Sequence, residues 1–155
     1  MITIAHIHPI AVHFPIVFFL SLAAFDCAMV VLGRTISGTS CAANVSAALA
    51  ALSGLTAIVA YSFGDMAYDA AIASGVAPDS LELHETIGSL TALLIVIWAL
   101  VRGYVWWRRM PIEGGLRPAV AGIEIAIALL IVVTAYYGGQ LVYELGVNVT
   151  RAAGV

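Results

Sequence analysis

Histidines are the residues of this chain best suited to chemistry. There are four of them: His6, His8, His13 and His84. A neutral imidazole can be an axial ligand of haem iron or a ligand of Zn²⁺ or Cu²⁺. The two cysteines, Cys27 and Cys41, lack the CxxC or CxxCH spacing of a thiol-redox motif or a covalent haem attachment site. The histidines therefore indicate a non-covalently held haem or a metal ion.

A second set of reactive residues carries charge inside apolar stretches of the chain. It consists of Asp26, Arg102 and Glu124. Unpaired charges in hydrocarbon cost several kcal/mol, and these three fall within one or two helical turns of a common depth. We expect a structural ion pair between Arg102 and Asp26 or Glu124. A proton path or a site for a quinone head group is the alternative.

The composition identifies the environment that must hold these residues. Of the 155 residues, 63 % are hydrophobic and 10 % are charged, whereas a soluble domain is about half apolar and about a quarter charged. Such a chain could not hide its apolar surface in water. This excludes a disordered chain, a nucleic-acid-binding domain and an ordinary cytosolic enzyme. An integral membrane protein in contact with lipid remains.

Four apolar stretches are long enough to span a bilayer, which takes roughly 20 residues each. They cover about residues 9–32, 41–63, 80–107 and 118–143, and the second is expected to continue as a helix to 74. The sequence thus predicts an all-α, up-down-up-down four-helix bundle in the membrane. Residues 1–155 are expected to form a single transmembrane domain.

Arginine placement predicts the orientation. The loops between spans 1 and 2 and between spans 3 and 4 carry Arg34, Arg108, Arg109 and Arg117. The other end carries Asp65, Asp69, Asp79, Glu82, Glu85 and Glu144, with Arg151 as its only basic residue. By the positive-inside rule both termini lie outside. In a bacterial inner membrane this side is the periplasm.

The four histidines all fall at this outer end. His13 lies about four residues inside the first span and His84 about four residues after the cap at Ser80, which places both roughly 6 Å below their helix starts. Two imidazoles at one depth can face one another across a four-helix bundle. His13 and His84 are therefore the expected axial ligands, with His8 as the alternative. His6 and His8 could instead be solvent-facing tail residues, and His13 and His84 could be interfacial hydrogen-bonding groups.

Small and hydroxyl-bearing residues fall at the same level. Four glycines would let a flat macrocycle approach the backbone: Gly64, Gly88, Gly138 and Gly139. Hydrogen bonds to carboxylate groups at the rim are expected from Tyr61, Tyr136, Tyr137 and Gln140. Pro15 cannot donate to the carbonyl of Ala11, and the freed carbonyl is expected to orient the imidazole of His13 or simply to mark a kink.

Residues 8–15, HPIAVHFP, resemble the HPxxVHFP opening motif of a widespread bacterial family of four-span membrane proteins of unknown function. The resemblance covers nearly the whole chain. His84 opens the third span as in that family, and residues 138–143, GGQLVY, resemble its closing motif. Some relatives carry a fused Rieske-type iron–sulfur domain, so the resemblance implies redox chemistry nearby. Glu85 directly after His84 departs from the family pattern.

The leading hypothesis is a b-type cytochrome-like membrane subunit with one haem b near the outer face. It would pass electrons between a periplasmic redox protein and quinone or a neighbouring membrane complex, and would be an electron-transfer subunit rather than a stand-alone catalyst. A different class of function is a Zn or Cu site built from His8, His13 and His84. A structural membrane subunit without a cofactor is the third. The sequence shows no nucleophile–base constellation of a hydrolase.

Overall fold

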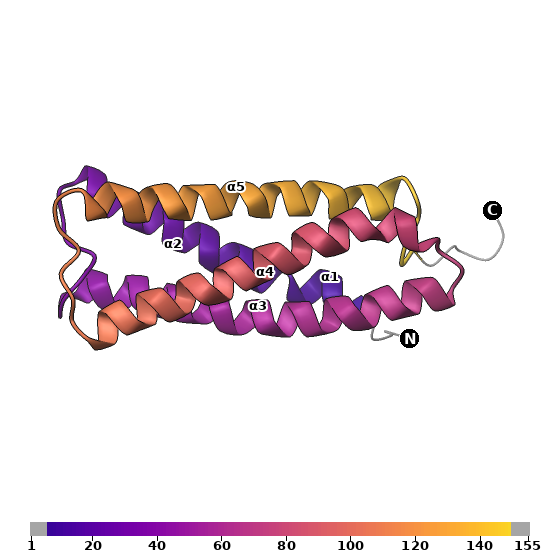
Figure 1. Ribbon diagram of the computed structural model, residues 1–155, viewed down its shortest axis with the longest axis horizontal. Helices are drawn as coiled ribbons and strands as arrows, with labels where there is room; N and C mark the ends of the chain where they lie inside the picture. Colours follow the sequence, from indigo (N-terminus) through magenta and orange to yellow (C-terminus); the bar gives the residue numbers. More distant parts are fainter. Residues whose placement is uncertain (1–5, 150–155) are drawn as a thin grey trace.

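Five helical segments build the protein in the computed structural model, which describes residues 6–149. They are α1 (Ile7–Ala11), α2 (His13–Val31), α3 (Cys41–Ala73), α4 (Pro78–Trp107) and α5 (Leu116–Tyr143). α1 and α2 follow one another along one edge of the bundle and act as its first long helix (Figure 1). α1 begins and α5 ends at the same end of the molecule, on the right in Figure 1. This confirms the predicted all-α four-helix bundle.

The four long helices are suited to a bilayer. Within the described residues, each of the segments Ile7–Val31, Cys41–Ala73, Pro78–Trp107 and Leu116–Tyr143 is long and apolar enough to cross a membrane. Only 22–39 % of the most apolar stretch of each helix is buried inside the protein. Most of the apolar surface of each helix therefore faces outward. Contact with lipid suits such a surface, whereas contact with water would be unfavourable.

The first helix begins earlier than the sequence indicated. α1 begins at Ile7, two residues before the predicted start near Pro9, and takes His8 into its first turn. The hydrogen-bond ladder is interrupted at Val12, because Pro15 has no N–H to offer the carbonyl of Ala11. The interruption changes the backbone little. Val12 keeps helical dihedrals (φ −62°, ψ −24°), and α2 continues in the direction of α1 (Figure 1).

The other helix ends follow local rules. The side chain of Ser40 accepts a hydrogen bond from the Ala43 amide at 3.1 Å and caps α3. Gly75 follows this helix with φ +95°, a conformation that glycine adopts without strain. α4 begins at Pro78 rather than at the predicted Ser80, because proline fits the first turn. Its N-cap residue is Ala77 and no side chain caps the helix, so the expected cap at Ser80 does not form.

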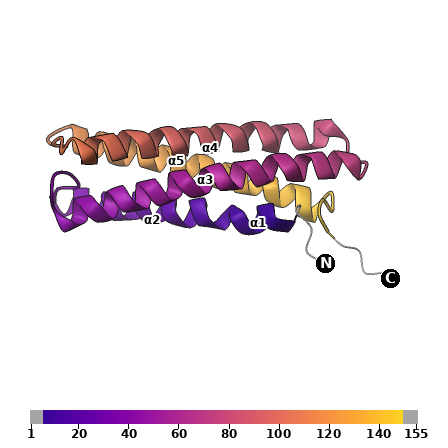
Figure 2. The same cartoon turned by 90° about the horizontal axis from the view of Figure 1, so that it is seen from below.

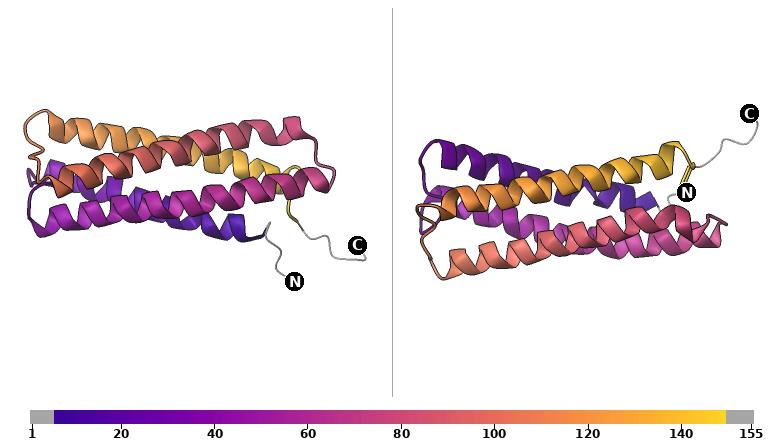
Figure 3. Two further views of the ribbon diagram at one scale, coloured as in Figure 1. Left: turned by 60° about the horizontal axis from the view of Figure 1, so that its bottom comes forward. Right: turned by 45° about the horizontal axis from the view of Figure 1, so that its top comes forward.

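Packing places the helices at the corners of a square. α3 packs against α2 and α4, and α5 packs against the same two helices, so the α1–α2 segment and α4 stand at diagonal corners (Figures 2 and 3). α1 packs on α3. Small residues allow the backbones of α3 and α4 to lie close together. A Cβ added at Gly54 on α3 would stand 2.6 Å from the Cβ of Ala99 on α4.

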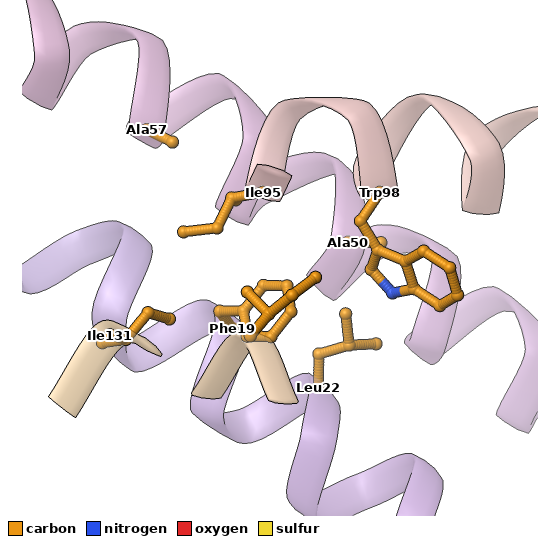
Figure 4. Close-up of a cluster of buried hydrophobic side chains, with 8 residues drawn as sticks. Phe19, Leu22, Ala50, Ala57, Ile95, Trp98 and Ile131 are labelled. Carbon is orange, nitrogen blue, oxygen red and sulfur yellow. The ribbon is translucent and has the colours of Figure 1, made fainter. Parts of the chain in front are cut away.

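A compact apolar core occupies the middle of the bundle (Figure 4). Its buried members come from four helices: Phe19, Leu22, Ala50, Ala57, Ile95, Trp98, Ile127 and Ile131. Phe19 and Leu22 are fully buried. This core lies between the histidine end of the bundle and the buried charges, so the two polar regions are separate sites.

Candidate functional site

A cavity of about 470 Å³ lies at the histidine end of the bundle. This volume falls within the usual range of about 300–1,000 Å³ for cofactor and ligand pockets. All the helices contribute to its wall, which includes His8, His84, Gly64 and Gly138 and aliphatic side chains such as Ile131. The cavity is the candidate functional site because two half-buried imidazoles enter an otherwise largely apolar space.

His8 is held by α3. Its Nδ1 lies 3.1 Å from the carbonyl oxygen of Ala60, and an imidazole nitrogen can meet a carbonyl only as an N–H donor. The proton is thereby assigned to Nδ1, which leaves the lone pair of Nε2 free. The ring packs on Gly64, where an added Cβ would stand 3.0 Å from Cε1. A backbone carbonyl that fixes the tautomer of an imidazole is a common feature of metal-ligating histidines.

His84 packs against α5. Its ring packs on Gly138, where an added Cβ would stand only 2.9 Å from Cε1. The carbonyl of Thr134, one turn before that glycine, lies close to this ring. The contact does not reach hydrogen-bond geometry, so the buried Nδ1 has no partner. The two imidazoles are close enough to interact electrostatically.

The two histidines occupy equivalent places in two helical hairpins. Each follows the start of its helix, and each ring rests on a glycine that lies one turn after a carbonyl on the next helix. His8 and His84 are as far apart along the chain as Asp26 and Arg102, which are separated by 76 residues. Buried residues recur at the same spacing of 76 residues. Phe19 corresponds to Ile95 and Leu22 to Trp98. The cavity therefore lies where two similar halves meet.

His13 borders the cavity but is exposed. Its Nδ1 lies 2.6 Å from the carbonyl oxygen of Pro9 on its own helix. The expected orientation by the carbonyl of Ala11 was therefore wrong, since Pro9 is the acceptor. His8, rather than His13, rests in a glycine cradle like that of His84. His6 stands at the N-cap of α1 and is half-buried.

The remaining predicted cavity residues divide into two groups. Gly88, Gly139 and Tyr61 line the cavity, as expected. Tyr136 and Gln140 do not, and instead the amide of Gln140 donates to the hydroxyl of Tyr136 at 3.1 Å on the outer face of α5. Both stand two residues from Gly138, about 200° around a helix with 3.6 residues per turn. Tyr137 also lies outside the cavity wall and contacts the ring of Tyr136 edge-on.

The charged residues predicted to pair lie together on the side of the core opposite the cavity. Arg102 Nη2 lies 2.7 Å from Asp26 Oδ2, and Arg102 Nε lies 4.0 Å from Glu124 Oε1. Asp26 and Glu124 are fully buried, and Arg102 is 4 % exposed. Two further polar residues complete this cluster, and the sequence analysis missed both. Ser46 donates to Asp26 at 2.8 Å, and the indole of Trp98 donates to Glu124 at 3.1 Å.

Carbonyl groups were the other feature that the sequence analysis missed. Ala60 has no functional side chain, and its role at His8 lies in the backbone alone. A weak signal was present, because Ala60 precedes Gly64 by one turn, as Thr134 precedes Gly138. In residues 6–149 no group of three or more His, Cys, Asp or Glu side chains is placed to hold a metal ion.

Comparison with known proteins supports the membrane assignment. No curated protein matches the chain, and no solved structure does. A family profile described as "Predicted membrane protein (DUF2231)" matches residues 5–151, which is nearly the whole chain. The chain belongs to this family of predicted membrane proteins, DUF2231.

Proposed function

We propose that the protein is a b-type cytochrome-like membrane subunit that holds one haem b in the cavity, with His8 and His84 as its axial ligands. The observation that carries this proposal is the arrangement of the two imidazoles. They enter one cavity from the diagonal corners of the bundle, and each ring is set on a glycine of a neighbouring helix. Haem iron takes one or two ligands from a protein, because the macrocycle supplies the other four, and His8 and His84 would be the two here.

The residues present fit this group in three respects. The Nδ1–H of His8 is engaged by Ala60, so Nε2 is the nitrogen available to iron. The rings of His8 and His84 occupy the space that a side chain at Gly64 or Gly138 would fill. His84 carries a buried Nδ1 without a partner, and ligation through Nε2 would place the proton on this atom, beside the carbonyl of Thr134.

The chemistry that haem supplies when bound is one-electron transfer. If His8 and His84 both hold the iron, it would have no open position for a substrate. The chain's own contribution is to hold the two rings, to fix the tautomer of His8 and to surround the cavity with Ile95, Ile131 and Ala57. This favours an electron-transfer subunit over a stand-alone catalyst. Its partners would be a periplasmic redox protein and either quinone or a neighbouring membrane complex.

The proposed location is a bacterial inner membrane with both termini in the periplasm. Arginines at the end opposite the cavity support this orientation: Arg34, Arg108, Arg109 and Arg117. The cavity end carries exposed acidic residues, among them Asp65 and Glu85. By the positive-inside rule the arginine-rich end faces the cytoplasm, and the haem would lie near the periplasmic face.

The test is the absorption spectrum of the full-length protein purified from cells with ample haem supply. We expect a Soret band, sharp bands on reduction and one haem per chain. His8→Ala and His84→Ala should each lose or alter these bands, and added imidazole should restore part of them if the variants are folded. His13→Ala is the matched control, because it removes the same side chain from the same edge of the bundle. It should keep the normal spectrum.

The outcomes separate the three hypotheses. A colourless protein that contains stoichiometric Zn or Cu would support the metal site built on His8, His13 and His84. A colourless protein without metal would support a structural subunit. If haem binds but is lost in His13→Ala and retained in His8→Ala, the original pair of His13 and His84 is correct and the pair proposed here is wrong.

A further inference from the structure

The charged cluster on the side of the core away from the cavity contains more acidic than basic groups. Two carboxyl groups, Asp26 on α2 and Glu124 on α5, lie beside one guanidinium, Arg102 on α4. All three are buried within the apolar bundle. With both acids ionised the cluster would carry a net negative charge in the membrane interior, which is strongly unfavourable.

The hydrogen bonds of the cluster leave particular atoms unused. Arg102 Nη2 donates to Asp26 Oδ2 and to Ser46 Oγ. Ser46 and Trp98 each donate to one carboxyl oxygen, Asp26 Oδ2 and Glu124 Oε1 respectively. The other oxygen of each acid, Asp26 Oδ1 and Glu124 Oε2, is buried without a partner, and so is Nη1 of Arg102. An unpartnered carboxylate oxygen in a dry interior is costly.

The two acids share one guanidinium. Asp26 Oδ2 lies 2.7 Å from Arg102 Nη2, and Glu124 Oε1 lies 4.0 Å from Arg102 Nε. Two ionised carboxyl groups cannot bond to one another, because neither oxygen carries a donor. Two carboxyl groups that share a site hold one proton between them, since like charges at this distance do not both persist. A single proton would therefore supply the missing donor and also neutralise the excess charge.

We propose that Asp26 and Glu124 share one bound proton, so that the cluster is an intramembrane proton-binding site with Arg102 as its counter-ion. Within residues 6–149, the thiol of Cys27 on α2 also interacts electrostatically with both acids. A cavity of about 10 Å³ beside Arg102 is lined by Ser37 and Trp106 and admits about one water molecule.

Infrared absorption of the full-length protein in lipid nanodiscs tests this site without reference to any cofactor. At pH 8 exposed carboxyl groups are ionised, so the C=O band of a protonated carboxyl group reports a buried one. We expect one such band per chain. Asp26→Asn and Glu124→Gln should each abolish it, because each leaves one carboxylate opposite one guanidinium. Both replacements preserve side-chain size, and Glu124→Gln keeps an oxygen to accept from Trp98.

Three further variants sharpen the test. Arg102→Leu removes the counter-ion, so both acids should be protonated and the band should grow about two-fold. Glu113→Gln, an exposed acid at the same end, should leave the band unchanged. The band should also persist in His84→Ala, which separates this proposal from the haem proposal. Absence of the band in the unaltered protein, or its survival in both Asp26→Asn and Glu124→Gln, would overturn the proposal. If Arg102→Leu does not fold, the two acid variants decide the question.

Discussion

A methyl group at Gly138 should weaken cofactor binding while leaving the fold intact. In Gly138→Ala the new Cβ would stand 2.9 Å from Cε1 of His84, whereas ordinary carbon–carbon contacts begin near 3.4 Å. The imidazole must therefore move by about 0.5 Å. Without a cofactor the ring can turn aside at little cost, because it is the end of a side chain. With iron bound, its position is fixed from both sides.

The size of the effect follows from this constraint. A methylene group forced into a packed site typically costs about 1–3 kcal/mol, and here the cost is confined to the cofactor-bound state. Haem affinity should then fall about 5- to 150-fold, since about 1.4 kcal/mol corresponds to a factor of ten. The apoprotein should be unchanged or slightly more stable, because alanine favours a helix over glycine by roughly 0.5–1 kcal/mol.

The assay is titration of the apoprotein with haem, followed by the Soret band, together with thermal unfolding in detergent. Gly122→Ala is the matched control, because it places the same methyl group on α5 where nothing lies within 4 Å. It should bind haem as the unaltered protein does. Equal affinity and identical spectra for Gly138→Ala would refute the reasoning, since the ring of His84 would then not be pinned against α5. An equal loss in Gly122→Ala would show a general effect on the helix.

Three further predictions concern stability and topology. Arg102→Leu should lower stability by about 3–5 kcal/mol, because it leaves buried acids without their counter-ion, and addition of Asp26→Asn should recover part of this loss; purely additive losses in the double-mutant cycle would show that the two residues do not interact. Phe19→Ala should lower the free energy of unfolding, measured by thermal unfolding, by about 3–5 kcal/mol, because Phe19 is fully buried in the core. A decrease below about 1 kcal/mol would contradict that packing. A reporter fused after Val155 should be active in the periplasm, and activity only in the cytoplasm would invert the proposed orientation.

Some features of the protein could be predicted from residue types alone. The apolar fraction and the length of four apolar stretches lead to a four-helix membrane bundle because a bilayer accepts little else. The grouping of Asp26, Arg102 and Glu124 was predictable for a similar reason. Charges in hydrocarbon must find partners, and three charges at one depth in a small bundle have few choices. Their hydrogen-bonding partners, Ser46 and Trp98, were not predictable, because small and aromatic residues are frequent on these helices for packing alone.

The identity of the histidine that faces His84 was decided only by tertiary structure. His8 and His13 are five residues apart, which is about 140° around a helix, so one helix cannot direct both rings to the same centre. The sequence placed both near one depth, and a helix start at Pro9 favoured His13. The structure begins α1 at Ile7 and packs it on α3, which brings His8 against Gly64 and the carbonyl of Ala60. Depth along a helix follows from counting residues, whereas the direction of a side chain depends on how neighbouring helices pack.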